Sequence, residues 1–438
     1  MIQDTSEECS LGGTEFFSTA PTQTSVRKRR KIIQHPQQST IVPGAPIDLI
    51  IAASDDGYMN LTHALHVEIK IVKADGSNME VKAANDDKDD NQVALGDMPL
   101  HNLFSQVDVY INEKLVTTSG NNYPYTAYFE KMLTYDPLTL DNQFSLELIS
   151  VNMDGKLQTF DATDDAWKNR AAYTNGSKSV YLRGSLHIPI LRQEKHLLNQ
   201  CSMRIKLHPN NQKFTLMSKD DATYKLKIVS AHLEMEKLEM NPDVLNEHAD
   251  KLRKQNAVYP IRRGEIKTFS IPAGNTSVVK ENLFVGKLPR RLVIANVDSE
   301  GYSGKLSMNP FNFQHFGLNY LCVYVDGERY PNKALEPNFA NGDYLDCLSS
   351  VYDGTGMRDE DRTLAINRTN YPKGNAIYVI QLTPGEPNCA AYDLVQKGNI
   401  RLEMKFTAPL AKTVTTLVYA EYDDQIEIDN DRNVFIDV

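Results

Sequence analysis

The stretch LPRRLVIANVDSEGYSGKLSMNPFNFQHFGLNYLCVYVDGERYP, residues Leu288–Pro331, contains two strand-like runs separated by an aromatic segment. The runs Arg291–Val297 and Leu318–Val325 are rich in β-branched and aromatic residues. The first is apolar on both faces, so we expect a strand that is covered on two sides. The second leads into Asp326-Gly327, which is typical of a hairpin. Asn309–Phe313 includes a proline that cannot donate to a β-ladder, and we interpret it as a packed corner where the chain leaves one sheet.

Composition sets the outer limits. The 438 residues are too many for one core and are 41% hydrophobic and 24% charged, as in a globular protein. The net charge of −10 argues against a surface that coats nucleic acid. No apolar run approaches the ~20 residues that span a bilayer, and the first residues have no signal core, so we expect synthesis in the cytosol and no membrane insertion. Five scattered cysteines lack metal-binding spacing, so we expect reduced thiols.

Other segments predict strands on both sides of a helix. Asn241-Pro242-Asp243 has the N-cap and first-turn proline of a helix start, and Tyr123–Leu133 has apolar residues at helical spacing. Three pairs of strand-like segments recur in the same order, which indicates a duplicated β-domain. The pairs are Ile47–Ile51 with Lys267–Ile271, Val109–Asn112 with Val323–Asp326, and Ser202–Leu207 with Asn399–Met404.

The predicted fold class is therefore all-β. We expect a double jelly roll of two tandem eight-stranded β-sandwiches, with short helices in loops and in the connector between the domains. The predicted domains are a flexible N-terminal arm (1–40), a first jelly roll (41–238), a connector helix (239–260) and a second jelly roll with a C-terminal tail (261–438).

One dense basic block, Arg27, Lys28, Arg29, Arg30 and Lys31, lies in the predicted arm. Three interpretations stay open at this stage: a solvated tail, a nuclear-import signal, or an arm that contacts nucleic acid. These five residues are the candidate functional residues of the sequence.

Long motifs of the chain resemble one family. They are PTQTS (Pro21–Ser25), LFSQVDVYINEKLV followed by NNYPYTAYFEKMLTY (Leu103–Tyr135), NAVYPIRRGEIKTFSIPAGN (Asn256–Asn275), LPRRLVIANVD, NPFNFQHF, and GNIRLEMKFTAPLAKTVTTLVYAEYDDQIEIDNDRNV. In order and nearly end to end, they look like the hexon-like major capsid proteins of Polinton (Maverick) elements and adintoviruses. The basic block after PTQTS departs from the family pattern, so no role for it is carried over.

The resemblance implies a structural protein that forms homotrimers, which act as pseudo-hexagonal capsomers of an icosahedral virion. It implies as partners other copies of the chain, a single jelly-roll penton protein, minor capsid proteins, and packaged DNA at the inner face. It implies location in the virion, after synthesis in the host cytosol and with assembly in the nucleus as one possibility. It implies no catalytic residues, no cofactor and no metal.

Two other classes remain as alternatives. A bicupin metalloenzyme needs a His-x-His pair, but the nearest histidines, His63 and His66, are expected on opposite sides of a strand. A lectin-like jelly roll is a further alternative, against which the missing signal core argues. The carboxylate pairs Glu234/Glu236 and Asp423/Asp424 are interpreted as solvated faces. We therefore expect that the protein is not an enzyme.

Overall fold

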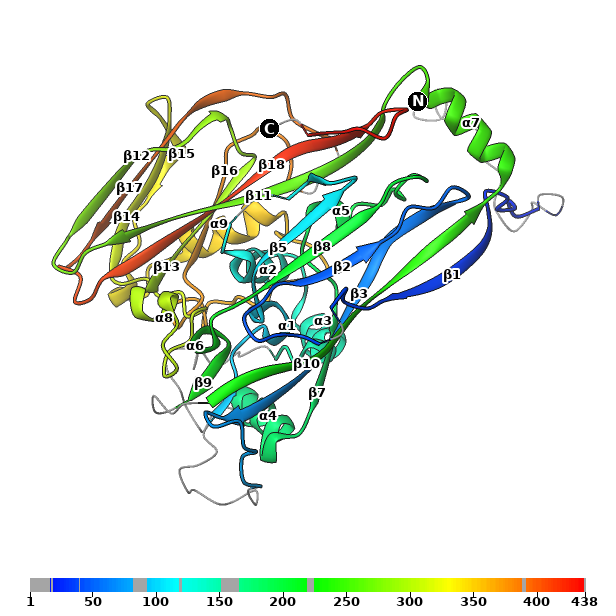
Figure 1. Ribbon diagram of the computed structural model, residues 1–438. Coiled ribbons are helices and arrows are strands. Elements are labelled where there is room, and N and C mark those ends of the chain that lie inside the picture. The colour runs from blue at the N-terminus through cyan, green and yellow to red at the C-terminus, as the bar shows by residue number, and fades with distance from the viewer. Residues whose placement is uncertain are drawn as a thin grey trace, which may run out of the picture.

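The computed structural model describes residues 16, 19–38, 40–81, 93–117, 120–150, 165–218, 224–387 and 391–436. Antiparallel sheets form the body of the molecule, and the helices lie in connections or against the sheets (Figure 1). None of the described helices is both long and apolar enough to cross a membrane.

The first sandwich consists of two four-stranded antiparallel sheets, with the orders β1-β10-β3-β7 and β2-β8-β5-β6. Strand β3 shows why the sheets pack face to face. Leu65, Val67 and Ile69 are almost fully buried, whereas the residues between them are only half-buried, as period-two alternation requires. The strands are β1 (Val26–Gln34), β2 (Ile47–Ile51), β3 (Gly57–Lys73), β5 (Phe104–Ile111), β6 (Lys114–Leu115), β7 (Val180–Gly184), β8 (Met203–Pro209) and β10 (Tyr224–Met240).

The second sandwich repeats this arrangement strand for strand. Its sheets have the orders β11-β18-β13-β16 and β12-β17-β14-β15, and β19 adds to β18. The prediction of a double jelly roll with two tandem eight-stranded sandwiches is therefore confirmed. The strands are β11 (Ala257–Ile271), β12 (Ser277–Lys287), β13 (Arg291–Asp298), β14 (Leu318–Val325), β15 (Glu328–Leu335), β16 (Ile377–Gln381), β17 (Lys397–Phe406), β18 (Val414–Ile428) and β19 (Val434–Ile436).

The stretch Leu288–Pro331 has the predicted structure. Strand β13 is central in its sheet, and its residues Leu292–Ala295 are fully buried. Strand β14 belongs to the opposite sheet, so the chain does change sheets at the corner Asn309–Phe313. Asp326 and Gly327 have φ angles of 48° and 92°, the left-handed conformation that a tight hairpin between β14 and β15 requires.

The sheet orders also test the predicted duplication. They make β5 equivalent to β14 and β8 equivalent to β17, which confirms two of the three predicted pairs. The third pair is wrong. Ile47–Ile51 is β2, the counterpart of β12, whereas Lys267–Ile271 belongs to β11, the counterpart of β1. Alternation identifies the buried face of a strand but not the sheet to which the strand belongs, which explains the error.

The predicted flexible arm at residues 1–40 is wrong for Val26–Gln34, because this segment is strand β1, paired with Leu233–Met240 of β10. The first sandwich therefore begins at Val26 and not at residue 41. The sequence did not reveal this strand, because only Val26, Ile32 and Gln34 of β1 are half-buried and five charged, exposed residues lie between the first two, so the apolar pattern is weak. Most of residues 1–18 lie outside the described residues.

Short helices are present in loops and in the connector, as predicted, but the connector helix is shorter than the predicted 239–260, because β10 extends to Met240 and β11 begins at Ala257. Helix α7 (Pro242–Leu252) begins at Asn241, whose side chain accepts a hydrogen bond from the backbone N–H of Asp243. Helix α2 (Tyr123–Met132) lies between the sandwiches (Figure 1). The remaining helices are α1 (Pro99–Asn102), α3 (Pro137–Asn142), α4 (Asp165–Thr174), α5 (Pro189–Arg192), α6 (Gln212–Thr215), α8 (Ser299–Ser303), α9 (Leu345–Thr355) and the short 3₁₀ turns Gln143–Glu147, Asn175–Ser177 and Phe339–Asn341; β4 (Val93–Leu95) pairs with β9 (Leu216–Ser218).

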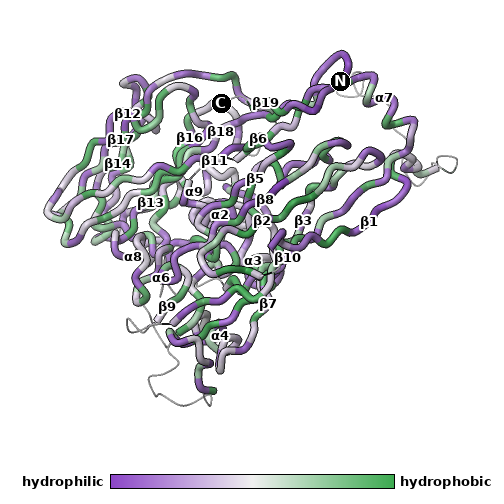
Figure 2. The backbone as a smooth tube through the Cα atoms, viewed as in Figure 1, coloured by the Kyte–Doolittle hydropathy of each residue, from purple (hydrophilic) through white to green (hydrophobic). Residues whose placement is uncertain are grey.

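The hydrophobic core is continuous between the two sandwiches. Hydrophobic and hydrophilic residues alternate along the strands of both halves (Figure 2). The buried apolar side chains of both sandwiches and of α2 belong to one connected cluster. The two sandwiches are therefore packed as one body, with α2 at the joint.

Candidate functional site: the basic strand and the joint between the sandwiches

The predicted functional residues Arg27, Lys28, Arg29, Arg30 and Lys31 lie together on strand β1, and all five are exposed. β1 is an edge strand of its sheet, with β10 as its partner. The block is therefore held in an extended conformation on the surface of the first sandwich and is not a free arm.

Carboxylates of β10 neutralise three of the five basic residues. Arg29, Arg30 and Lys31 form ion pairs with Glu236, Glu239 and Glu234 at N···O distances of 3.6, 3.0 and 2.7 Å. The hydrogen bond from Lys31 is the main reason that the pKa of Glu234 falls to about 2. Exposed pairs of this kind each contribute only about 0–1 kcal/mol, so they mainly fix the position of β1 and reduce its net charge.

Arg27 and Lys28 differ from the other three. Within the described part of the chain they form no ion pair, and both side chains are exposed. The positive charge that remains available to an anionic partner is therefore concentrated at the start of β1.

The joint between the sandwiches is an aromatic cluster that the sequence analysis did not single out as functional. Tyr128 of α2 stacks on Phe311 with a centroid distance of 4.8 Å and an interplanar angle of 6°. Phe129 stacks on Phe313 at 5.5 Å and lies 6.0 Å from Tyr419 of β18. Each such pair contributes about 0.5–1.5 kcal/mol beyond burial of its area. The corner Asn309–Phe313 of the second sandwich is thus fixed to a helix of the first.

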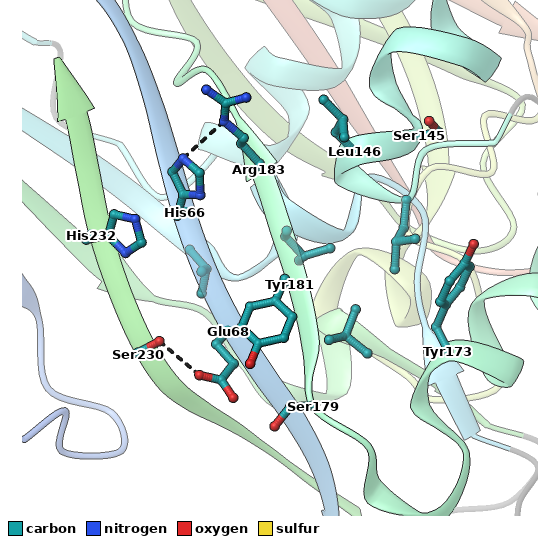
Figure 3. A pocket seen from close by; sticks show the side chains of 14 residues that line it. His66, Glu68, Ser145, Leu146, Tyr173, Ser179, Tyr181, Arg183, Ser230 and His232 are labelled. Atoms are coloured by element: carbon teal, nitrogen blue, oxygen red, sulfur yellow. Dashed lines mark hydrogen bonds between the residues drawn. The ribbon is translucent and has the colours of Figure 1, made fainter. Parts of the chain in front are cut away.

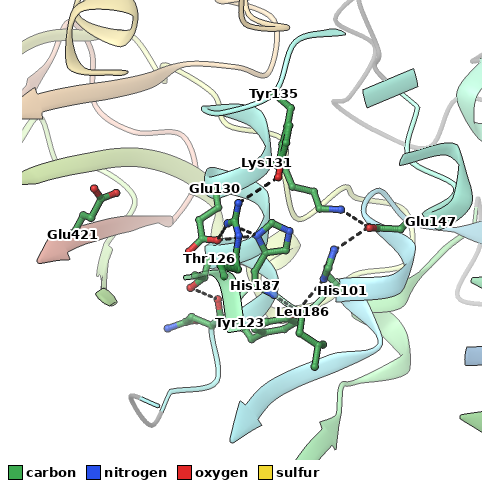
Figure 4. A network of polar contacts seen from close by, with 12 residues as sticks. His101, Tyr123, Thr126, Glu130, Lys131, Tyr135, Glu147, Leu186, His187 and Glu421 are labelled. Atoms are coloured by element: carbon green, nitrogen blue, oxygen red, sulfur yellow. Dashed lines mark hydrogen bonds and ion pairs between the residues drawn. The ribbon is translucent and has the colours of Figure 1, made fainter. Parts of the chain in front are cut away.

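A buried polar network lies beside this cluster (Figure 4). Glu147 contacts both Lys131 Nζ and His101 Nε2, the latter at 2.9 Å, and Glu147 and Lys131 are almost completely buried. Burial raises the pKa of Glu147, but the two partners outweigh burial and hold this pKa at about 2. Burial lowers the pKa of Lys131 to about 8. At neutral pH the two side chains therefore form an ion pair, and loss of either one would leave an unpaired charge in the core.

A second group extends the network to the surface. Glu130 of α2 accepts a hydrogen bond from Arg192 and lies 2.8 Å from His187 Nδ1. Burial lowers the pKa of both His187 and His101, so these rings are neutral hydrogen-bonding groups at neutral pH. A cleft of about 500 Å³ opens here between the sandwiches, and it is lined in part by Glu130, Arg192 and Glu421.

The sequence contains one signal for this network. Glu130-Lys131 is a charged pair inside the otherwise uncharged motif YTAYFEKML, on a helix in which no residue is exposed. Charged residues in such a helix are expected to be paired when they are buried. Their partners, which are 16 to 62 residues distant in the chain, have no sequence signal of their own.

One carboxylate pair differs from its interpretation. Asp424 is buried and accepts a hydrogen bond from Arg263 Nε at 2.9 Å, and burial raises the pKa of Asp423. The interpretation of Asp423/Asp424 as a solvated face is therefore wrong. In β18 the two residues pair with Arg262 and Ile261 of β11, and their carboxylates face the guanidinium groups of Arg263 and Arg290.

The histidines nearest the bicupin pattern do face opposite sides of β3. His63 is buried, its Nδ1 lies 2.9 Å from the carbonyl oxygen of Leu61, and its Nε2 accepts from the N–H of Leu186. His66 lies on the other face, half-exposed. Both ring nitrogens of His63 thus contact backbone groups.

The whole chain is similar to solved structures of viral proteins. It matches a chain in the cryo-EM structure of the Sputnik virophage with a TM-score of 0.62 and 12% identity, covering 99% of this chain and 93% of that chain. It matches the PBCV-1 virus capsid with a TM-score of 0.58 and 11% identity, covering 97% and 99%. The mavirus major capsid protein matches with a TM-score of 0.54 and 12% identity, covering 99% and 95%.

Sequence comparison also finds a relative. An uncharacterised protein of Caenorhabditis elegans, F54H12.2, is 24% identical over 351 residues, which cover 77% of this chain and 80% of that protein. No family model matches the sequence. The chain thus has the double jelly-roll fold, in the same arrangement over nearly its whole length as the virophage and virus chains.

Proposed function

We propose that this chain is the major capsid protein of an icosahedral virion, built by a DNA virus or a Polinton-like element. The observation that carries the proposal is the repeated sheet order, β1-β10-β3-β7 with β2-β8-β5-β6 and β11-β18-β13-β16 with β12-β17-β14-β15, locked into one body by α2. Two equivalent sandwiches in fixed orientation give one subunit two of the six corners of a hexagonal tile.

In this proposal the capsomer is a homotrimer. Three subunits supply six sandwiches, and the tile then has approximate sixfold symmetry from a threefold assembly. The joint must be rigid, because a hinge between the sandwiches would allow the corners of the tile to move independently. The aromatic rings that stack across the joint supply that rigidity, and the Lys131–Glu147 ion pair fixes α2 within the first half. An obligate interface of this type buries more than ~2,000 Å².

The resemblance of the motifs to Polinton and adintovirus capsid proteins supports the finer assignment. In that setting the partners are further copies of the chain in the lattice, a single jelly-roll penton protein, minor capsid proteins and packaged DNA at the inner face. The chain would be made in the host cytosol, assembled there or in the nucleus, and found in the virion.

For the basic strand we propose contact with packaged DNA in preference to nuclear import. An import signal is recognised as an extended, accessible peptide, but the backbone of Val26–Gln34 is already hydrogen-bonded to β10. Side chains that project from a strand are compatible with phosphate contacts. Arg27 and Lys28 are the unpaired members of the block and are therefore the main candidates for these contacts.

Negative-stain microscopy of the purified chain tests the proposal. A capsid protein of this kind forms hexagonal particles or closed shells. A field of single 49.4 kDa particles under conditions in which the protein is folded would contradict it.

A further inference from the structure

Three potential metal ligands lie together on the outer face of the sheet β1-β10-β3-β7. His66 of β3 and His232 of β10 are directly opposite each other in the antiparallel ladder. Their rings stack with a centroid distance of 4.5 Å and an interplanar angle of 12° (Figure 3). Glu234 follows two residues after His232 and is therefore on the same face. These three residues are called the His-Glu cluster below.

The cluster is compact enough to bind an ion. One ligand atom from each of the three side chains lies within 4.8 Å of the others, and His66 Nε2 is 3.2 Å from Glu234 Oε2. In a tetrahedral site with bonds of ~2.0–2.1 Å, ligand atoms are about 3.3 Å apart. The distance between His66 and Glu234 already has this value. Rotation of the half-exposed imidazole rings would bring the other pairs of ligand atoms to the same separation.

We propose that His66, His232 and Glu234 bind a divalent transition-metal ion of the Zn²⁺ class. Two imidazoles and one carboxylate form a ligand set that zinc uses widely, whereas Ca²⁺ and Mg²⁺ favour all-oxygen sites. The fourth ligand is water or His35, whose ring centroid is 5.6 Å from that of His232. The cluster lies at the edge of a surface cavity of about 550 Å³, which gives an ion access.

Two cationic side chains contact the ligand lone pairs. Arg183 Nε donates to His66 Nε2 at 3.0 Å, and Arg183 Nη2 donates to Glu234 Oε2 at 3.2 Å. Lys31 Nζ pairs with Glu234 Oε1 at 2.7 Å. Both the histidine nitrogen and the carboxylate thus already point their lone pairs at a positive charge.

These two side chains can be displaced, because the side chains of Arg183 and Lys31 are 50% and 58% exposed. A metal ion would take the place of the guanidinium between His66 and Glu234. Arg183 therefore competes with the metal, and its removal should strengthen binding. A bound ion would join β3 to β10 across their outer face and stabilise the folded sheet by mass action.

The experiment is a titration of the full-length chain, freed of metal by a chelator, with Zn²⁺ alone by calorimetry and with Co²⁺ by visible absorption. The variants are His66→Ala, His232→Ala and Arg183→Met. Glu68→Gln is the matched control, because Glu68 lies on the same strand and the same face as His66 but contacts Ser230 instead of the cluster. Circular dichroism verifies that each variant is folded.

We expect one Zn²⁺ per chain, a Co²⁺ spectrum with the intense bands of a tetrahedral site, and a rise in the melting temperature with added Zn²⁺. Each His→Ala change should weaken Zn²⁺ binding by at least ~10-fold, because even mutation of residues that only hydrogen-bond to metal ligands lowers metal affinity by that factor. Arg183→Met should bind more tightly than the parent, and Glu68→Gln should bind as the parent does. No binding to the parent, or equal binding by folded parent and His→Ala variants, would overturn the proposal.

Discussion

Tyr128 and Phe311 stack face to face across the joint between the sandwiches, at 4.8 Å and 6°, although 183 residues separate them in the chain. Both side chains are buried. Tyr128 belongs to a helix of the first half, and Phe311 belongs to the corner where the second half changes sheets. The stability that is lost when this contact is removed therefore measures how strongly it holds the two halves together.

Replacement of Phe311 by Ala should destabilise the chain by about 3–5 kcal/mol, because it removes a fully buried ring and leaves a cavity. Chemical denaturation, followed by fluorescence and circular dichroism, measures this loss. Tyr181→Ala is the control, because Tyr181 is 73% exposed, and its change should remain within about 0.5 kcal/mol. Similar stability of the two variants would show that the joint contributes little.

A charge introduced into strand β13 should prevent folding. Val293→Asp or Ile294→Asp buries an unpaired carboxylate at a fully buried position, at a cost of about 3–5 kcal/mol or more. We expect insoluble protein or loss of trimers, measured by solubility and size-exclusion chromatography. Val285→Asp is the matched control, because Val285 is 69% exposed on β12. A soluble, trimeric Val293→Asp variant would refute the placement of β13.

The buried Lys131–Glu147 pair predicts a specific acid sensitivity. The pKa of Glu147 is about 2 in the folded chain, below its usual value of 4.5, so the pair stabilises the folded state above about pH 4.5. This contribution is lost as the pH falls from about 4.5 towards 2, because the unfolded chain binds the proton first. The free energy of unfolding, measured as a function of pH, should therefore decline in this window.

A double variant, Lys131→Met with Glu147→Leu, isolates that effect. Apolar replacements remove both buried charges together, so this variant should lose the part of the acid-dependent decline that belongs to Glu147. Glu147→Gln alone leaves Lys131 buried without its partner and should be more destabilising than the double variant. Identical pH profiles of parent and double variant would contradict the role assigned to the pair.

The basic strand predicts salt-dependent DNA binding. We expect most DNA binding by trimers to be abolished when Gln replaces all five basic residues, Arg27, Lys28, Arg29, Arg30 and Lys31. The salt dependence should also fall, because the slope of log K against log[salt] is about −0.9 per phosphate contact. Shells of this variant should be poorly filled with DNA. Lys225→Gln with Lys227→Gln, exposed on the same sheet, is the control. Loss of nuclear accumulation with normally filled shells would instead support the import hypothesis.

The sequence predicted most of the fold because the strands of both sandwiches alternate clearly around apolar positions. Strand β13 was predicted from four apolar residues in succession, and β14 from its hairpin signal. Strands β1 and β12 were missed, and both are largely exposed edge strands whose inward positions are few. Such strands are specified by their partners, as the acidic residues of β10 specify the basic β1.

The candidate functional features were less predictable. The composition of the basic block identified its five residues, but the carboxylates that pair with them lie more than 200 residues away. The His-Glu cluster depends on the register that places His66 opposite His232, 166 residues later in the chain. No local pattern contains that register, because a shift of one residue would point one ring into the core.

The mass of the folded chain in solution tests the central claim most directly. Multi-angle light scattering at micromolar concentration should give a particle of about three times 49.4 kDa, with larger shells as the only other species. Because the trimer interface of a capsomer is extensive, this mass should not change on tenfold dilution. A folded particle of 49.4 kDa at micromolar concentration would contradict the proposal that the chain is a capsomer subunit.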